Sequence, residues 1–218
     1  MRILCIGDSN TWGYNAKTGL RYQRRWTRVL QELLPNDEII EEGLNGRTFA
    51  LVDPFCKERC GLDALPSILR SQDPIDLVLV MLGTNDLKVI FHAHAEAIAK
   101  GARNFIREIQ NKYYYNYEVP EILMISPILL GENIVELEGI YGDFDQDGLI
   151  QSKYLAQEIK KVCDEYQVHF MDAAKYAMAS NYDCIHMDEE NHEKLANALF
   201  NKIKEIEDKN EKRTNRRD

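Results

Sequence analysis

The run at residues 76–82, DLVLVML, constrains the fold of this chain more than any other stretch. An apolar run without polar alternation is buried on both faces, as strands of a parallel sheet are. Further strands are expected at residues 3–6, 38–44, 121–128 and 168–172. Helical patterns separate them, at residues 21–34, 62–71, 93–111, 149–166 and 189–206. Strands alternating with helices predict a three-layer α/β/α sandwich around a parallel sheet of about five strands, for which we expect the flavodoxin-like order.

The length of 218 residues fits a single domain, which we expect to cover residues 1–206. Residues 207–218 are almost wholly charged or polar and are expected to fray. The net charge of −9 argues against a nucleic-acid partner, because such a surface needs clustered Lys and Arg.

The apolar runs and the cysteines indicate the cellular compartment of the protein. Only four apolar residues follow Arg2, too few for a signal peptide, and no run has the length of a membrane span. The five cysteines are odd in number, and Cys5 and Cys163 lie inside apolar patterns. These features predict a reduced, cytoplasmic protein with no membrane partner, and they leave a homo-oligomer open.

A candidate nucleophile follows the first strand. The strand ends at Gly7, and the turn Asp8-Ser9 places the Ser9 hydroxyl at the carboxyl edge of the sheet. Ligands bind at that edge in open α/β sheets. The alternative is that Ser9 caps the next helix, since serine is a preferred N-cap residue.

A candidate base stands near the other end of the chain, where Asp183 precedes His186 by three residues. An aspartate at that spacing can accept the Nδ1–H of the imidazole and leave Nε2 free to take a proton from a serine. A surface loop with a chance D-x-x-H pattern gives the same spacing. His192 has no aspartate three residues before it, so we prefer His186.

Donors for a negatively charged intermediate can be found at three strand ends. The Ser9 N–H, the backbone of Gly46 and the side-chain amide of Asn85 are candidates for an oxyanion hole. A plain Asn-Gly turn and a loop asparagine bonded to its own backbone are the alternatives for the last two.

These motifs also carry a resemblance. GDSNTWG, the Gly46 loop, GTND and D-x-x-H, in this order over residues 2–199, resemble the four blocks of the SGNH (GDSL) hydrolase superfamily. The resemblance implies Ser9 as nucleophile, His186 as base, Asp183 as its partner, and an oxyanion hole made by Ser9, Gly46 and Asn85. RWT at 25–27, EEGLNGRT at 41–48 and MLGTNDLK at 81–88 are similar to the bacterial arylesterase and acyltransferase branch.

The function so implied is a serine ester hydrolase that acts on small acyl esters through an acyl-enzyme and needs no cofactor. Acyl transfer to an acceptor other than water is included in that expectation. A carbohydrate acetyl esterase is the alternative, because it would share every catalytic residue. A non-catalytic binding protein on the same fold is a third reading.

Residues around the motifs carry further expectations. Asn10 stands where the family name has Leu, and we expect it to alter the pocket edge but not the triad. Cys184 stands where glycine is common, and it should stiffen the loop or place a thiol near the site. Trp12 and Tyr14 follow the nucleophile and are expected to line the substrate pocket, the alternative being that they pack the first helix.

No metal site is expected. The segment 143–148, DFDQDG, opens like a calcium-binding EF-hand loop, but its twelfth position is Tyr154 rather than glutamate. His92 and His94 lack further ligands at metal-binding spacing, and Cys56 and Cys60 lack a second pair. We therefore interpret 143–148 as a polar loop near the mouth of the site.

Overall fold

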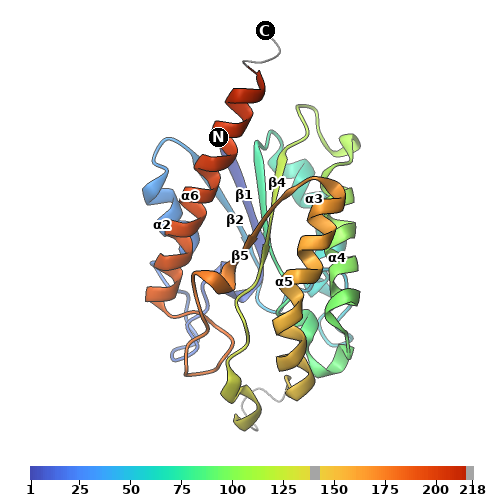
Figure 1. Cartoon of the computed structure of the whole chain (residues 1–218), viewed down its shortest axis with the longest axis vertical. Helices are drawn as coiled ribbons and strands as arrows, with labels where there is room; N and C mark the ends of the chain where they lie inside the picture. The colour runs from blue at the N-terminus through green and yellow to red at the C-terminus, as the bar shows by residue number, and fades with distance from the viewer. Residues whose placement is uncertain (138–142, 215–218) are drawn as a thin grey trace.

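A computed structural model describes residues 1–137 and 143–214 and shows a parallel sheet between two helical layers (Figure 1). The strands are β1 (Arg2–Gly7), β2 (Glu38–Gly43), β3 (Leu77–Met81), β4 (Glu121–Ser126) and β5 (His169–Asp172). Their order is β2-β1-β3-β4-β5, with every neighbouring pair parallel. This order is flavodoxin-like, so the predicted fold class is confirmed.

The helices cover both faces of the sheet. They are α1 (Ser9–Trp12), α2 (Trp26–Leu33), α3 (Gly61–Gln72), α4 (Ala95–Ile109), α5 (Gln146–Tyr166) and α6 (Glu189–Thr214). Helices α2 and α6 pack on one face and α3, α4 and α5 on the other. In β3, Val78 and Val80 face the second group while Leu77 and Leu79 face the first, and all are buried. The unbroken apolar run therefore predicted burial on both faces correctly.

Two helix boundaries differ from the expected ones. Helix α2 begins at Trp26, because residues before it are held in extended contacts: Arg21 bridges to Tyr14, and the Tyr22 N–H donates to the Gly13 carbonyl. Helix α6 continues past Ile206 to Thr214, beyond its predicted end, and the fraying of residues 207–218 stays a prediction. Two segments lie outside the described residues: 215–218 at the end of the chain, and 138–142 between β4 and α5.

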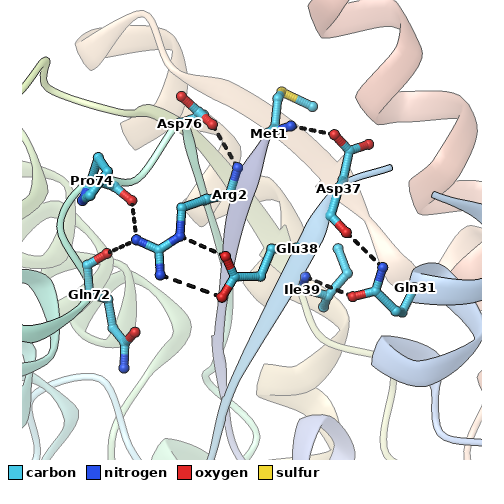
Figure 2. A network of polar contacts seen from close by, with 9 residues as sticks. All are labelled: Met1, Arg2, Gln31, Asp37, Glu38, Ile39, Gln72, Pro74 and Asp76. Carbon is cyan, nitrogen blue, oxygen red and sulfur yellow. Dashed lines mark hydrogen bonds and ion pairs between the residues drawn. The ribbon is translucent and has the colours of Figure 1, made fainter. Parts of the chain in front are cut away.

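The amino edge of the sheet is closed by a polar network around Arg2 (Figure 2). The Arg2 side chain donates to Glu38 on β2 at 2.8 Å and to the carbonyls of Gln72 and Pro74 at 3.0 and 2.8 Å. The Arg2 N–H donates to Asp76 at 2.6 Å. These bonds join β1, β2 and the entry to β3 at the edge opposite Ser9, so the strands meet there in a fixed register.

Across the described residues, none of the helices combines the length and the apolar character that crossing a bilayer requires.

Candidate active site

Ser9 begins a single helical turn at the end of β1. Asp8, not Ser9, caps that turn, because its carboxylate accepts the Asn10 N–H at 2.9 Å. The turn ends at Gly13, which has a φ of +88° that glycine adopts without strain. The Ser9 hydroxyl is thus left for another partner, which decides against the capping alternative.

That partner is His186. The Ser9 Oγ lies 2.8 Å from His186 Nε2, and His186 Nδ1 lies 2.5 Å from Asp183 Oδ2. All three side chains are buried. Burial alone would raise the pKa of Asp183, but hydrogen bonds from the His186 ring and from the His186 and Ile185 N–H groups hold this pKa below its usual value. The carboxylate therefore stays ionised and keeps Nδ1 protonated, so that Nε2 can accept the hydroxyl proton.

Cys184 explains why glycine is common at its position. Its φ is +61°, in the left-handed region that disfavours residues with a Cβ. The residue is buried and packs against Gly131, whose N–H donates to the Cys184 carbonyl at 2.8 Å. A Cβ on Gly131 would come within 2.9 Å of the Cys184 Sγ. The side chain therefore braces the loop and is not among the residues that line the cleft beside Ser9.

Gly46 and Asn85 reach the same cleft as Ser9. Gly46 has a φ of +82°, a conformation that favours glycine, and a Cβ there would lie 2.6 Å from Arg59 Nε, so the Arg59 side chain would have to move. Asn85 Nδ2 donates to the carbonyl of Arg47 at 3.1 Å rather than to its own backbone. Arg47 is buried and donates to the carbonyls of Gly7 and Glu42. The loop after β2 is thereby tied to the strand that carries the nucleophile.

The cleft measures about 540 Å³, part of it open to solvent. Besides Ser9, Gly46, Asn85 and His186, it is lined by Tyr14, Asn45, Arg59, Lys88, Asp143, Phe144 and Ile185. Tyr14 lines it as predicted, with its ring centroid 4.7 Å from that of His186. Trp12 does not line it, and that part of the prediction is wrong: its ring lies 5.3 Å from the Arg21 guanidinium, and its centroid lies 6.3 Å from that of the Tyr14 ring.

Sequence reasoning did not single out Arg59 or Phe144, since neither belongs to a block motif. Lys88 closes the MLGTNDLK block, and its Nζ lies 2.6 Å from Asp143 Oδ2. Asp145, of the EF-hand-like segment, accepts the Gly148 N–H at 2.9 Å at the start of α5. This segment does contribute to the mouth of the cleft, as expected.

Asn10 lies elsewhere than predicted. It is 2% exposed, and its side chain bonds to the backbone of Ile185 at 3.1 Å and of Met187 at 2.9 Å, on either side of His186. The expectation that it shapes the pocket edge is therefore wrong, because its amide reaches the histidine loop and Asn10 does not line the cleft.

Three other titratable groups are buried near the site. Burial raises the pKa of Asp8 to about 6 and that of Asp86 to about 7. Asp86 accepts the Phe49 N–H and so anchors the segment that follows the Gly46 loop. Burial lowers the pKa of His192 to about 3, and its Nδ1 accepts the Trp26 N–H at 3.4 Å. His192 is thus a neutral core residue.

Comparisons with known proteins show the family to which the chain belongs. The model of the GDSL-like Lipase/Acylhydrolase family matches residues 5–194. Est24, a carbohydrate acetylesterase from Sinorhizobium meliloti, is 32% identical, with a TM-score of 0.88 over 94% of this chain and 99% of that one. The native aryl esterase of M. smegmatis is 33% identical, with a TM-score of 0.87 over 94% of this chain and 98% of that one.

A putative arylesterase from Agrobacterium tumefaciens str. C58 is 33% identical, with a TM-score of 0.82 over 94% of this chain and 99% of that one. The comparison with curated proteins gave no match. The family match spans most of the chain and includes Ser9, Gly46, Asn85, Asp183 and His186. The chain therefore belongs to the GDSL-like lipase/acylhydrolase family, and with it to the SGNH-type esterases.

Proposed function

We propose that this chain is a serine esterase that hydrolyses small acyl esters, aryl esters foremost, through an acyl-enzyme. The observation that carries the proposal is the contact of 2.8 Å between Ser9 Oγ and His186 Nε2 in a cleft that also holds Gly46 and Asn85. A non-catalytic binding protein has no need for a hydroxyl, an imidazole and a buried carboxylate in this alignment.

The proposed reaction has two steps. Ser9 Oγ attacks the ester carbonyl while His186 Nε2 takes its proton. The carbonyl oxygen becomes an anion that accepts from the Ser9 N–H, the Gly46 N–H and the Asn85 amide. His186 then gives the proton to the departing alcohol or phenol, and the acyl group stays on Ser9. Water, or another alcohol, attacks the acyl-enzyme with His186 as base and restores the hydroxyl.

A second candidate function is the removal of acetyl groups from carbohydrates. Besides Ser9, Tyr14, Asn85 and His186, the cleft is lined by four polar side chains: Asn45, Arg59, Lys88 and Asp143. They offer donors and acceptors of the kind that sugar hydroxyls bind. The apolar part of the lining, with Phe144, suits an aryl group instead. The similar structures include proteins described in both ways, so they support both candidates equally.

Phenyl acetate and an acetylated xylose, assayed on one preparation, separate the candidates. We expect a kcat/KM at least tenfold higher for phenyl acetate. Arg59→Met, which keeps the aliphatic stem against Gly46, should then lower phenyl acetate turnover less than threefold, because an aryl group needs no guanidinium. If the xylose ester is preferred and Arg59→Met lowers its kcat/KM about tenfold, the carbohydrate function replaces the aryl one. Arg24→Met, at an exposed ion pair with Glu32, is the matched control.

The rate should fall at acid pH, because a protonated His186 cannot act as the base. Asp183 does not contribute to this limb, since its lowered pKa keeps it ionised. Initial rates with phenyl acetate between about pH 5 and about pH 8 measure this fall in rate, and a flat profile contradicts the role of His186.

Circular dichroism at each pH tests whether the protein stays folded while the rate falls, and the buried carboxyl groups indicate that it does. The folded-state pKa values of Asp8 and Asp86, about 6 and about 7, lie above the ordinary value of 3.8. Their contribution to stability is therefore complete at acid pH and is lost as the pH rises through these values. Asp183 has the opposite sign, and its stabilising contribution is lost only below about pH 4. None of the three groups makes the protein unfold along the acid limb.

A further inference from the structure

Each of the two peptide groups that flank His186 makes one hydrogen bond through its N–H and one through its carbonyl. In the peptide between residues 185 and 186, the N–H of His186 donates to Asp183 Oδ1 at 3.0 Å, and the Ile185 carbonyl accepts from Asn10 Nδ2 at 3.1 Å. In the next peptide, the His186 carbonyl accepts from the Ser180 N–H at 2.8 Å, and the Met187 N–H donates to Asn10 Oδ1 at 2.9 Å. Both planes are thus fixed, and with them the direction in which the imidazole leaves the backbone.

Asn10 supplies one of the two bonds on each side. Its amide can be oriented in one way only, because a carbonyl accepts and an N–H donates. The residue is the direct neighbour of Ser9 and sits in the same capped turn. The segment that carries the hydroxyl is thereby joined, by two hydrogen bonds that do not involve the reacting atoms, to the loop that carries the base.

We propose that Asn10 is a positioning residue, which holds His186 Nε2 at hydrogen-bonding distance from Ser9 Oγ and so makes proton transfer efficient. This inference rests on the proposed function and adds a residue to it. Proton transfer in a triad depends on distance and alignment, and a displacement of about 1 Å can cost about a hundredfold in rate.

In this chain the two backbone groups depend on the chemistry of the Asn10 side chain. Leucine has nearly the same shape but neither donates nor accepts, so it would leave the Ile185 carbonyl and the Met187 N–H without a side-chain partner. Both of these residues are buried, at 6% and 1% exposed, so the loop would have to shift toward water or other donors to satisfy them. A shift of the loop moves His186 and Ile185 with it, while the cleft walls formed by the other segments stay in place.

Asn10→Leu tests this, with Asn191→Leu as the matched control. Asn191 is also buried, and its Oδ1 accepts the Met178 N–H at 3.0 Å, but its side chain does not reach the backbone beside His186. We expect Asn10→Leu to lower kcat for phenyl acetate about a hundredfold with KM changed less than threefold. Asn191→Leu should lower kcat less than threefold, even where it lowers the melting temperature as much.

The ring proton between His186 Nδ1 and Asp183 Oδ2 gives a readout that needs no substrate. Its low-field NMR resonance should be present in the wild-type protein and in Asn191→Leu, and be shifted or broadened beyond detection in Asn10→Leu. Asn10→Ala, which introduces no bulk, replaces the leucine variant if that one does not fold.

Two results would overturn the inference: an unchanged resonance in the Asn10 variant, or a loss of kcat that Asn191→Leu matches at equal loss of stability. If the wild-type protein fails to hydrolyse esters, the proposed function fails, but the resonance still reports whether Asn10 orients His186.

Discussion

Ser9→Ala is expected to lower kcat for phenyl acetate by a factor on the order of 10⁶, to the level of a blank without enzyme. The Ser9 hydroxyl is the group placed to attack, and its hydrogen bond is made to His186 Nε2. The backbone of the turn does not use that hydroxyl, because Asp8 provides the cap. The free energy of unfolding should therefore change by no more than about 1 kcal/mol.

Ser126→Ala is the matched control. Ser126 is the last residue of β4, fully buried at the same carboxyl edge, and its hydroxyl donates to Asp172 at 3.2 Å, away from the cleft. It should keep kcat within about threefold. A fluorophosphonate should label the wild type and Ser126→Ala but not Ser9→Ala. Turnover or labelling that persists in Ser9→Ala would assign the nucleophile to another residue.

Asp183→Asn is expected to lower kcat about 10⁴-fold with the fold intact. Asp183 Oδ1 accepts two backbone N–H groups, from Ile185 and His186, so the amide oxygen of asparagine must take that place. The side-chain NH₂ group of the asparagine then donates a hydrogen bond to His186 Nδ1, so Nδ1 must be the unprotonated nitrogen that accepts it. The imidazole proton moves to Nε2, where it blocks the nitrogen that has to take the proton of Ser9.

Asp188→Asn separates this tautomer effect from a general loss of charge. Asp188 accepts the Asn191 N–H at 3.0 Å at the start of α6 and does not bond to His186. Its replacement should change kcat less than threefold. Steady-state kinetics with melting curves on both variants provide the measurement. If the Asp183→Asn enzyme keeps more than a tenth of the wild-type rate, Asp183 does not set the tautomer of His186.

The fold could be predicted well because its signals are local. Because β3 is buried on both faces, its sequence is an unbroken apolar run. The carboxyl ends of parallel strands share an edge, so Ser9 and Asn85 had to approach one another. Boundaries such as the start of α2 were missed because a bridge between Arg21 and Tyr14, rather than helix propensity, decides them.

The walls of the candidate site could not be predicted in the same way. Arg59 and Phe144 reach the cleft through loops whose paths depend on packing, and no periodicity encodes those paths. The partners of Asn10 are 175 and 177 residues away in sequence, so the presence of an asparagine at position 10 does not predict them. Trp12 was misplaced for a related reason, since the contact with Arg21 that holds it arises only in the folded loop.

The distance along the chain between Ser9 and His186 has a consequence for biosynthesis. The ribosome delivers Ser9, the proposed nucleophile, 177 residues before His186, its proposed proton acceptor. Nascent chains that lack the segment before α6 hold neither the base nor the two backbone groups that Asn10 binds. On the proposed mechanism, ester cleavage begins only when the last part of the sheet and its final loop have docked, and translation products that end before His186 should be inert.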